Sequence, residues 1–170
     1  VALAGASLFT GCKNSGDSYN LLKEGAGELT VLQVTAAMGN KNKDGKYTIP
    51  ALQAGQDGQH ATISFPMSIT NGRTNPIYVT PDNFKVVVTS SDGKNVKKYS
   101  VTIEDALKDT NLKKGSSVSG NVTAQDVTLK AGDVVVLTYC PDLQYNEYSL
   151  NWKLTVSKKE SSASTTSTTT

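Results

Sequence analysis

The sequence has little of the chemistry on which enzyme and metal sites depend. Its 170 residues contain one histidine and two cysteines. A Ser-His-Asp or Cys-His arrangement would have to be built on His60, and no Gly-x-Ser-x-Gly motif surrounds a serine nucleophile. One histidine and two widely separated cysteines cannot supply the closely spaced ligands of a zinc site. The sequence therefore predicts no metal, no cofactor and no enzyme, with His60 as an exposed structural residue.

A strong excess of one charge is also missing. Seventeen Lys and Arg residues against fifteen Asp and Glu give a formal charge of +2, and Arg73 is the only arginine. Nucleic-acid binding depends on clustered positive charge, which this scattered pattern does not provide. We therefore expect no nucleic-acid partner, and we interpret the lysines as solvated faces and as protection of strand edges.

No hydrophobic run is long enough to cross a bilayer, which needs about 20 residues. The apolar stretch Val1–Gly11 instead has the length of a signal-peptide core. Its end, Phe9-Thr10-Gly11-Cys12, resembles the bacterial lipoprotein signal, with Phe9 where that signal usually has Leu, Val or Ile. The resemblance implies that Cys12 is lipidated, that the sequence begins inside an export signal, and that residues 1–12 lie outside the fold. The alternative is a buried strand or helix with an ordinary core cysteine.

The chain divides by composition into a folded unit and two polar ends. Residues 13–27 are rich in Gly, Ser, Asn and Lys and are predicted to be a flexible tether, with a brief helical turn at 19–24. Residues 158–170 (KKESSASTTSTTT) are predicted to be a disordered tail, because they hold too little apolar surface to order themselves. The alternative for this tail is an O-glycosylated brush. The folded unit is therefore predicted to span residues 28–157 as one domain.

Within that unit, apolar and polar residues alternate with the period of half-buried strands. Residues 61–70 place Ala, Ile, Phe, Met and Ile on one face, and residues 148–156 place Tyr, Leu, Trp, Leu and Val on one face. Pro66 cannot donate to a ladder, so it must face an edge or a bulge. The further strands predicted are 28–38, 77–80, 84–90, 96–103, 117–129 (with a break near Ala124-Gln125) and 133–140. Only residues 105–108 read as locally helical.

Turn chemistry separates these short strands. Ser91-Asp92-Gly93-Lys94 carries the Asp-Gly pair favoured in tight hairpins, and Lys130-Ala131-Gly132-Asp133 is similar. Short strands spaced by such turns predict an all-β, antiparallel sandwich rather than a parallel sheet.

Two segments carry a family resemblance: SFPMSITNGRTNPIYVTPDNFKVVVTSSDGK at Ser64–Lys94 and LKKGSSVSGNVTAQDVTLKAGDVVVLTY at Leu112–Tyr139. They resemble the uncharacterised immunoglobulin-like domain of small Gram-positive surface lipoproteins, over residues 28–157. The chain departs from that pattern at Thr123 and Ala124, where a bulkier apolar residue is expected. The resemblance implies an immunoglobulin-like β-sandwich and brings no active site with it.

Three tyrosines near one predicted loop, Tyr139, Tyr145 and Tyr148, form the candidate binding surface, since tyrosine offers a large contact area and a polar tip. The alternative places Tyr139 and Tyr148 inside the core and leaves only Tyr145 exposed. Cys140, ahead of Pro141, is interpreted as a buried structural thiol.

The loop Asn40–Lys46 imitates half of a calcium loop. It lacks the bidentate Glu, because Ala51 holds the twelfth position. We therefore interpret it as a solvated loop.

These observations predict a bacterial lipoprotein on the extracellular face of the cell membrane, attached to the membrane by a lipid at Cys12. Its role is predicted to be non-enzymatic binding of a protein or envelope polymer. The alternative is an accessory subunit that binds a solute or an envelope polymer.

Overall fold

The computed structural model describes residues 20–49, 52, 60–143 and 148–158. Within these ranges no helix has the length and apolar character needed to cross a membrane. A 3-10 turn, η1 (Pro81–Asn83), lies between two of the strands. The strands are β1 (Asn20–Glu24), β2 (Gly27–Val31), β3 (Val34–Met38), β4 (Asn40–Lys41), β5 (Tyr47–Thr48), β6 (Ala61–Asn71), β7 (Ile77–Val79), β8 (Phe84–Thr89), β9 (Val96–Tyr99), β10 (Thr102–Ile103), β11 (Asp109–Leu112), β12 (Ser117–Val127), β13 (Val134–Tyr139) and β14 (Ser149–Thr155).

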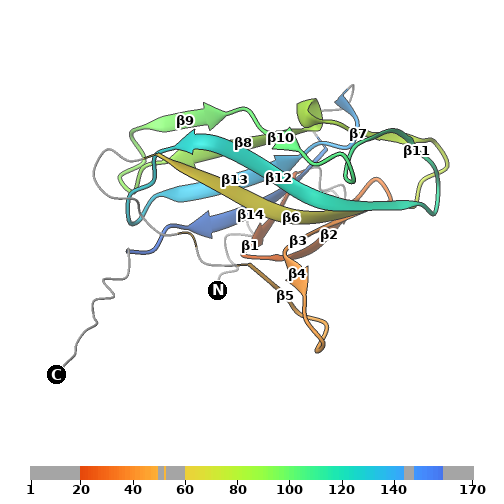
Figure 1. The fold of residues 1–170 in the computed structure, drawn as a ribbon, viewed down its shortest axis with the longest axis horizontal. Helices are drawn as coiled ribbons and strands as arrows, with labels where there is room; N and C mark the ends of the chain where they lie inside the picture. The colour runs from red at the N-terminus through yellow and green to blue at the C-terminus, as the bar shows by residue number, and fades with distance from the viewer. Residues whose placement is uncertain (1–19, 50–51, 53–59, 144–147, 159–170) are drawn as a thin grey trace.

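Two five-stranded sheets form the molecule, as the sequence predicts for an all-β sandwich (Figure 1). The β14 sheet has the strand order β1-β14-β13-β8-β9, and the β6 sheet has the order β10-β12-β6-β3-β2. All the pairings in both sheets are antiparallel, except that β1 runs parallel to β14. Two short ribbons, β7 with β11 and β4 with β5, complete the described strands.

The core lies between the two sheets and is lined by the two strands with the clearest alternation. In β6, Ile63, Phe65, Met67 and Ile69 are buried, and in β14, Leu150 and Trp152 are fully buried. Each fully buried side chain of this kind stabilises the fold by about 1.5–3 kcal/mol. Trp152 Nε1 also donates a hydrogen bond of 2.9 Å to Gly27 O in the opposite sheet. The predicted faces of both strands are therefore confirmed.

The predicted tether over 13–27 is wrong for its last residues. Asn20–Glu24 is strand β1, paired in register with Ser149–Lys153, and the helical turn expected at 19–24 is absent from the described residues 20–24. The sequence of β1, Asn-Leu-Leu-Lys-Glu, does not alternate between apolar and polar residues, because β1 is an edge strand with no fully buried side chain. The folded unit therefore begins at least eight residues before residue 28.

The predicted strand 28–38 is a hairpin, β2 and β3, whose turn consists of Leu32 and Gln33. Both turn residues have positive φ, 52° and 63°, which is the geometry of the primed turns that favour Asn and Gly. Gly72 N donates to Gln33 O at 2.7 Å, and a Cβ on Gly72 would lie 2.6 Å from that oxygen. The sequence Leu-Gln does not predict this turn, because the turn is held by its contact with Gly72 and not by residues that favour positive φ.

The predicted strand 96–103 is divided in two. β9 pairs with β8 and β10 pairs with β12, so the chain changes sheets between Tyr99 and Thr102. The buried side chain of Val101 fills the crossing point.

The long strand β12 does contain the irregularity predicted for it. Its register against β6 is regular through Thr123 and Ala124 and shifts between Ala124 and Val127. Pro66 lies where β6 has lost its second neighbour, since β3 pairs with β6 only from Met67 onward. The expectation of an edge position for Pro66 is therefore confirmed.

Candidate functional site at the β7 end

One end of the sandwich gathers the connections that carry exposed apolar side chains, and we name it the β7 end. Its described residues are Asn20, Asn71–Asn83, Lys113–Ser116 and Tyr139–Leu143. Figure 1 shows β7, β11 and η1 together at this end, away from the arrowhead of β14.

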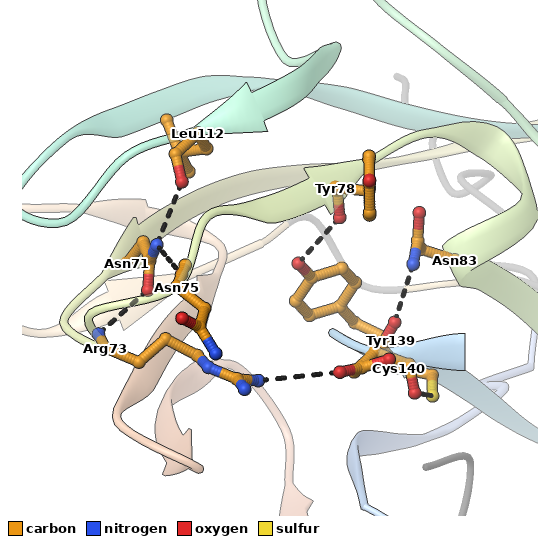
Figure 2. Close-up of polar contacts among 9 residues, drawn as sticks. Asn71, Arg73, Asn75, Tyr78, Asn83, Leu112, Tyr139 and Cys140 are labelled. Carbon is orange, nitrogen blue, oxygen red and sulfur yellow. Dashed lines mark hydrogen bonds and ion pairs between the residues drawn. The ribbon is translucent and has the colours of Figure 1, made fainter. Parts of the chain in front are cut away.

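Asn71 fixes the loop that follows β6. Its side chain is fully buried, and its Nδ2 donates to Asn75 O and to Leu112 O, both at 2.9 Å. Its Oδ1 accepts a hydrogen bond of 2.8 Å from the backbone N–H of Arg73 (Figure 2). Three bonds from one side chain hold two separate connections, so this part of the β7 end is rigid.

On the other side of β7, the side chain of Asn83 likewise joins two separate connections by hydrogen bonds. Its Oδ1 accepts hydrogen bonds from the backbone N and the Oγ1 of Thr80, at 3.0 and 2.7 Å. Its Nδ2 donates to Cys140 O at 2.8 Å, and Cys140 N donates to Asn83 O at 2.8 Å (Figure 2). The end of β13 is therefore locked to the turn η1.

Tyr139 lies beneath this end and not on its surface. Its ring is fully buried, stacks on Phe84 with ring centroids 4.9 Å apart, and donates its hydroxyl to Tyr78 O at 3.3 Å. Burial raises the pKa of the Tyr139 hydroxyl above its ordinary value, because the phenolate would be desolvated. The hydroxyl therefore stays a donor, and the prediction of Tyr139 as part of a binding surface is wrong.

A cavity of about 460 Å³ opens at the β7 end. Two of its lining residues are exposed large hydrophobic side chains: Tyr78 is 57% exposed and Leu143 is 52% exposed. Pro76 and Pro141 line it as well. Polar Thr80, Asn83 and Asp142 complete its lining, so the cavity is a recess of mixed character, of a size that ligand pockets commonly have.

A second cavity of about 490 Å³ lies on the outer face of the β14 sheet and shares Asn83 and Leu143 with the first. It is lined by apolar side chains, among them Phe84 and Val136, and by hydrogen-bonded polar side chains. Thr138 Oγ1 donates to Asn151 Oδ1 at 2.6 Å, and Asn151 Nδ2 donates to Ser149 Oγ at 3.0 Å. Each of the two cavities therefore combines apolar and polar lining residues.

The charged pair of the β7 end is Arg73 with Asp142, whose Nη1 and Oδ2 lie 3.7 Å apart. Arg73 Nη1 is buried and makes no hydrogen bond with the described residues, so this contact is an ion pair alone. The pair ties the connection after β6 to the connection after β13. The carboxylate of Asp142 is thus opposed by a guanidinium that stays protonated.

The remaining predicted residues divide between the core and the undescribed part of the chain. Tyr148 is partly buried against the core, as the alternative for the tyrosines holds, and Cys140 is buried, as predicted, with its Sγ 3.4 Å from Asp142 O. Cys12, Tyr145 and the predicted tail from residue 159 lie outside the described residues.

Sequence reasoning missed Tyr78 and Leu143. The alternation of Ile77, Tyr78 and Val79 could have revealed Tyr78, because period two turns the middle side chain outward.

The other candidate residues from the sequence, His60 and the loop 40–46, lie away from the β7 end or make hydrogen bonds within their own loop. His60 is exposed near the start of β6, and its Nδ1 lies 3.1 Å from Asp126 O and 3.3 Å from Thr128 Oγ1. In the loop 40–46, Asn42 Oδ1 accepts backbone hydrogen bonds from Asp44 and Lys46 at 2.9 and 3.0 Å. No group of three or more His, Cys, Asp or Glu side chains able to hold a metal ion occurs in the described ranges.

Comparison with known proteins gives likeness in structure only. No protein-family model matches the chain, and no curated protein matches it. A candidate lipoprotein (ycdA) from Bacillus subtilis is similar with a TM-score of 0.49 and 16% identity, over 75% of this chain and 38% of that protein. The secreted protein MPT63 from Mycobacterium tuberculosis is similar with a TM-score of 0.40 and 16% identity, over 80% of this chain and 98% of that one. The chain thus spans well under half the length of the first protein and nearly all of the second.

Proposed function

We propose that the protein is an extracellular lipoprotein whose immunoglobulin-like sandwich binds a partner of the cell envelope through its β7 end, without catalysing a reaction. One observation carries the proposal: Tyr78 and Leu143 are exposed beside a cavity on a frame held by Asn71 and Asn83. Recognition surfaces commonly present large exposed side chains on a rigid frame. Such a frame loses little conformational entropy when a partner binds and covers the side chains.

The strand order supports the immunoglobulin-like assignment. In such domains one sheet has the order A-B-E-D and the other has C-F-G, to which variable-type domains add a strand beside C. Here β3-β6-β12-β10 corresponds to the first sheet, and β9-β8-β13-β14 corresponds to the second with its added strand. By this correspondence the connections at the β7 end are those between B and C and between F and G.

Attachment to the membrane rests on the sequence. An apolar run that ends at Cys12 and is followed at once by the polar residues 13–18 has the pattern of a lipoprotein signal. Two acyl chains on such a cysteine hold a protein to a bilayer far more firmly than one.

The proposal is tested by retention of envelope material on the immobilised chain, residues 13–170. Envelope fragments, which contain lipids, proteins and polymers, are passed over the wild type and over Tyr78→Ser, Leu143→Ser and Val96→Ser variants. Val96 is the matched control, because it is 60% exposed and lies on β9, outside the β7 end. We expect the first two variants to lose retained material and Val96→Ser to keep it. Equal retention by all four proteins would contradict the proposal.

A second candidate function is binding of a small solute or an envelope polymer in the joined cavities. It is favoured by the contiguity of the two cavities, each with apolar and polar lining residues, through Asn83 and Leu143. A ligand present at 100 times its dissociation constant adds about 2.7 kcal/mol to the stability of the folded state. Thermal unfolding against a panel of sugars and wall fragments measures this, and Thr138→Val should remove the shift.

A further inference from the structure

The β7 end is also the end at which the N-terminal segment joins the sandwich. Asn20, the first residue of β1, pairs in register with Ser149, the first residue of β14. Ser149 Oγ donates a hydrogen bond of 2.5 Å to Asn20 Oδ1. Asn20 and Leu143 line the same cavity, and Leu143 and Tyr78 line the next one. The point of entry and the exposed side chains therefore belong to one continuous surface.

The segment that leads from Cys12 to this surface is short. Seven residues, 13–19, separate Cys12 from Asn20, and even when fully extended this segment spans at most about 28 Å. If Cys12 carries the lipid, as the proposed function on which this inference rests requires, Asn20 at the β7 end stays within that distance of the bilayer. The last described residues lie at the opposite end, where Val156 N bonds to Asp133 O at 2.8 Å.

The side chains of the β7 end suit a membrane surface. Tyr78 and Leu143 are two of the three exposed large hydrophobic residues in the described ranges, and the third, Val96, is at the opposite end. Tyrosine is enriched where hydrocarbon meets water, because its ring is apolar and its hydroxyl is polar. The two apolar side chains thus lie on the part of the surface nearest the anchor.

Charge at this end also favours an anionic surface. Lys113 and Lys114 are exposed on the turn that Gly115 N fastens to Asn71 O at 2.6 Å. Of the nearby carboxylates, Asp142 is paired with Arg73, Asp82 is exposed, and Asp109, opposite Val79 on β11, accepts a hydrogen bond of 2.7 Å from the backbone N–H of Asn111. Lysines close to an anionic membrane add to binding, and this addition falls off within a Debye length.

We propose that the β7 end docks on the surface of an anionic phospholipid bilayer, with Tyr78 and Leu143 at the interface and Lys113 and Lys114 over the headgroups. The tether raises the effective concentration of the surface at the bilayer, so contacts too weak to bind a free protein are populated. The opposite end, with β9 and the start of β13, then faces away from the membrane.

The test uses the lipid-anchored protein purified from its membrane and placed in vesicles that contain phosphatidylglycerol. The lipid occupies the Cys12 thiol, and Cys140→Ala removes the buried thiol, so a single added cysteine takes an environment-sensitive fluorophore. Tyr78→Cys, Leu143→Cys and Val96→Cys are labelled and quenched by nitroxide-bearing lipid. We expect several-fold stronger quenching at positions 78 and 143 than at 96. Equal quenching at the three positions would overturn the proposal.

The charge contribution has its own matched pair of variants. Replacement of Lys113 and Lys114 by alanine should lower the ratio of docked to undocked protein by about 30-fold, since each lysine near the surface contributes about fivefold. The same replacement at Lys97 and Lys98, which are exposed on β9, should leave the ratio unchanged. No loss from Lys113→Ala with Lys114→Ala would contradict the assigned charge contact.

Failure of the anchor is distinguishable from failure of docking. A chain whose Cys12 carries no lipid does not float with the vesicles, and this result overturns the anchored function together with the docking that rests on it. A chain that floats with the vesicles but shows no preferential quenching at positions 78 and 143 overturns docking alone.

Discussion

At the scale of single residues, the β7 end owes its shape to polar groups that sequence patterns do not reveal. Asn71 and Asn83 are buried amides, and each joins segments far apart in the chain. The neighbouring sequence does not distinguish Asn71 and Asn83 from exposed asparagines in turns, because the backbone carbonyls that they bind come from distant segments of the fold. Their roles therefore could not be predicted from the sequence.

Asn71→Ala should destabilise the protein by about 2–4 kcal/mol, because it leaves the carbonyls of Asn75 and Leu112 without their donor. Urea unfolding followed by Trp152 fluorescence measures the change. Asn75→Ala is the matched control, since Asn75 is exposed and contributes its backbone oxygen, and it should change the stability by less than about 0.5 kcal/mol. Equal losses in the two variants would contradict the role assigned to Asn71.

Tyr139→Phe should cost about 1 kcal/mol at pH 8, through the lost hydrogen bond to Tyr78 O. The folded state raises the pKa of Tyr139, so its contribution is complete below the unfolded pKa of about 10 and is lost as the pH rises above it. The stability difference between wild type and variant should therefore shrink above pH 10. Unfolding curves at pH 8 to 11 measure it, and a difference independent of pH would refute the assignment.

At the scale of elements, the alternation of apolar and polar residues correctly predicted the strands that bury one face. β6 and β14 followed their patterns, and the Asp92-Gly93 pair marked the β8–β9 turn, where Gly93 has φ 75°. The elements that were missed depend on contacts with distant residues. The Leu32-Gln33 turn depends on Gly72, and β1 depends on its pairing with β14.

Gln33→Gly should stabilise the protein by about 0.5–1 kcal/mol, because glycine accepts the positive φ of 63° that costs an ordinary residue about 1–2 kcal/mol, less its own entropic cost. Thr30→Gly, in the exposed part of neighbouring β2, should instead destabilise by about 0.5–1 kcal/mol. Thermal unfolding of the two variants should shift in opposite directions, and a loss in both would count against a strained turn.

A chain that begins at Glu28 should be less stable than one that begins at Lys13, by about 2–4 kcal/mol. The shorter chain lacks β1 and lacks Gly27, whose carbonyl accepts the hydrogen bond from Trp152. Denaturant midpoints of the two chains decide the matter. Equal midpoints would restore the tether prediction for residues 20–27.

At the scale of the whole molecule, the two ends of the sandwich differ in character. The β7 end combines the entry of the chain, two exposed large hydrophobic side chains and two joined cavities. The opposite end carries the turns 91–94 and 130–133 and the last described residues. The sequence predicted the sandwich and the anchor separately, but the strand that connects them shows which end the anchor would hold near the membrane.

Mass spectrometry of the N-terminal peptide of the native protein tests the central claim most directly. The account predicts a chain that begins at Cys12 and carries the added mass of a lipid on that residue. An uncleaved terminus with an unmodified Cys12 would contradict it, and would remove the reason to place the β7 end at a membrane.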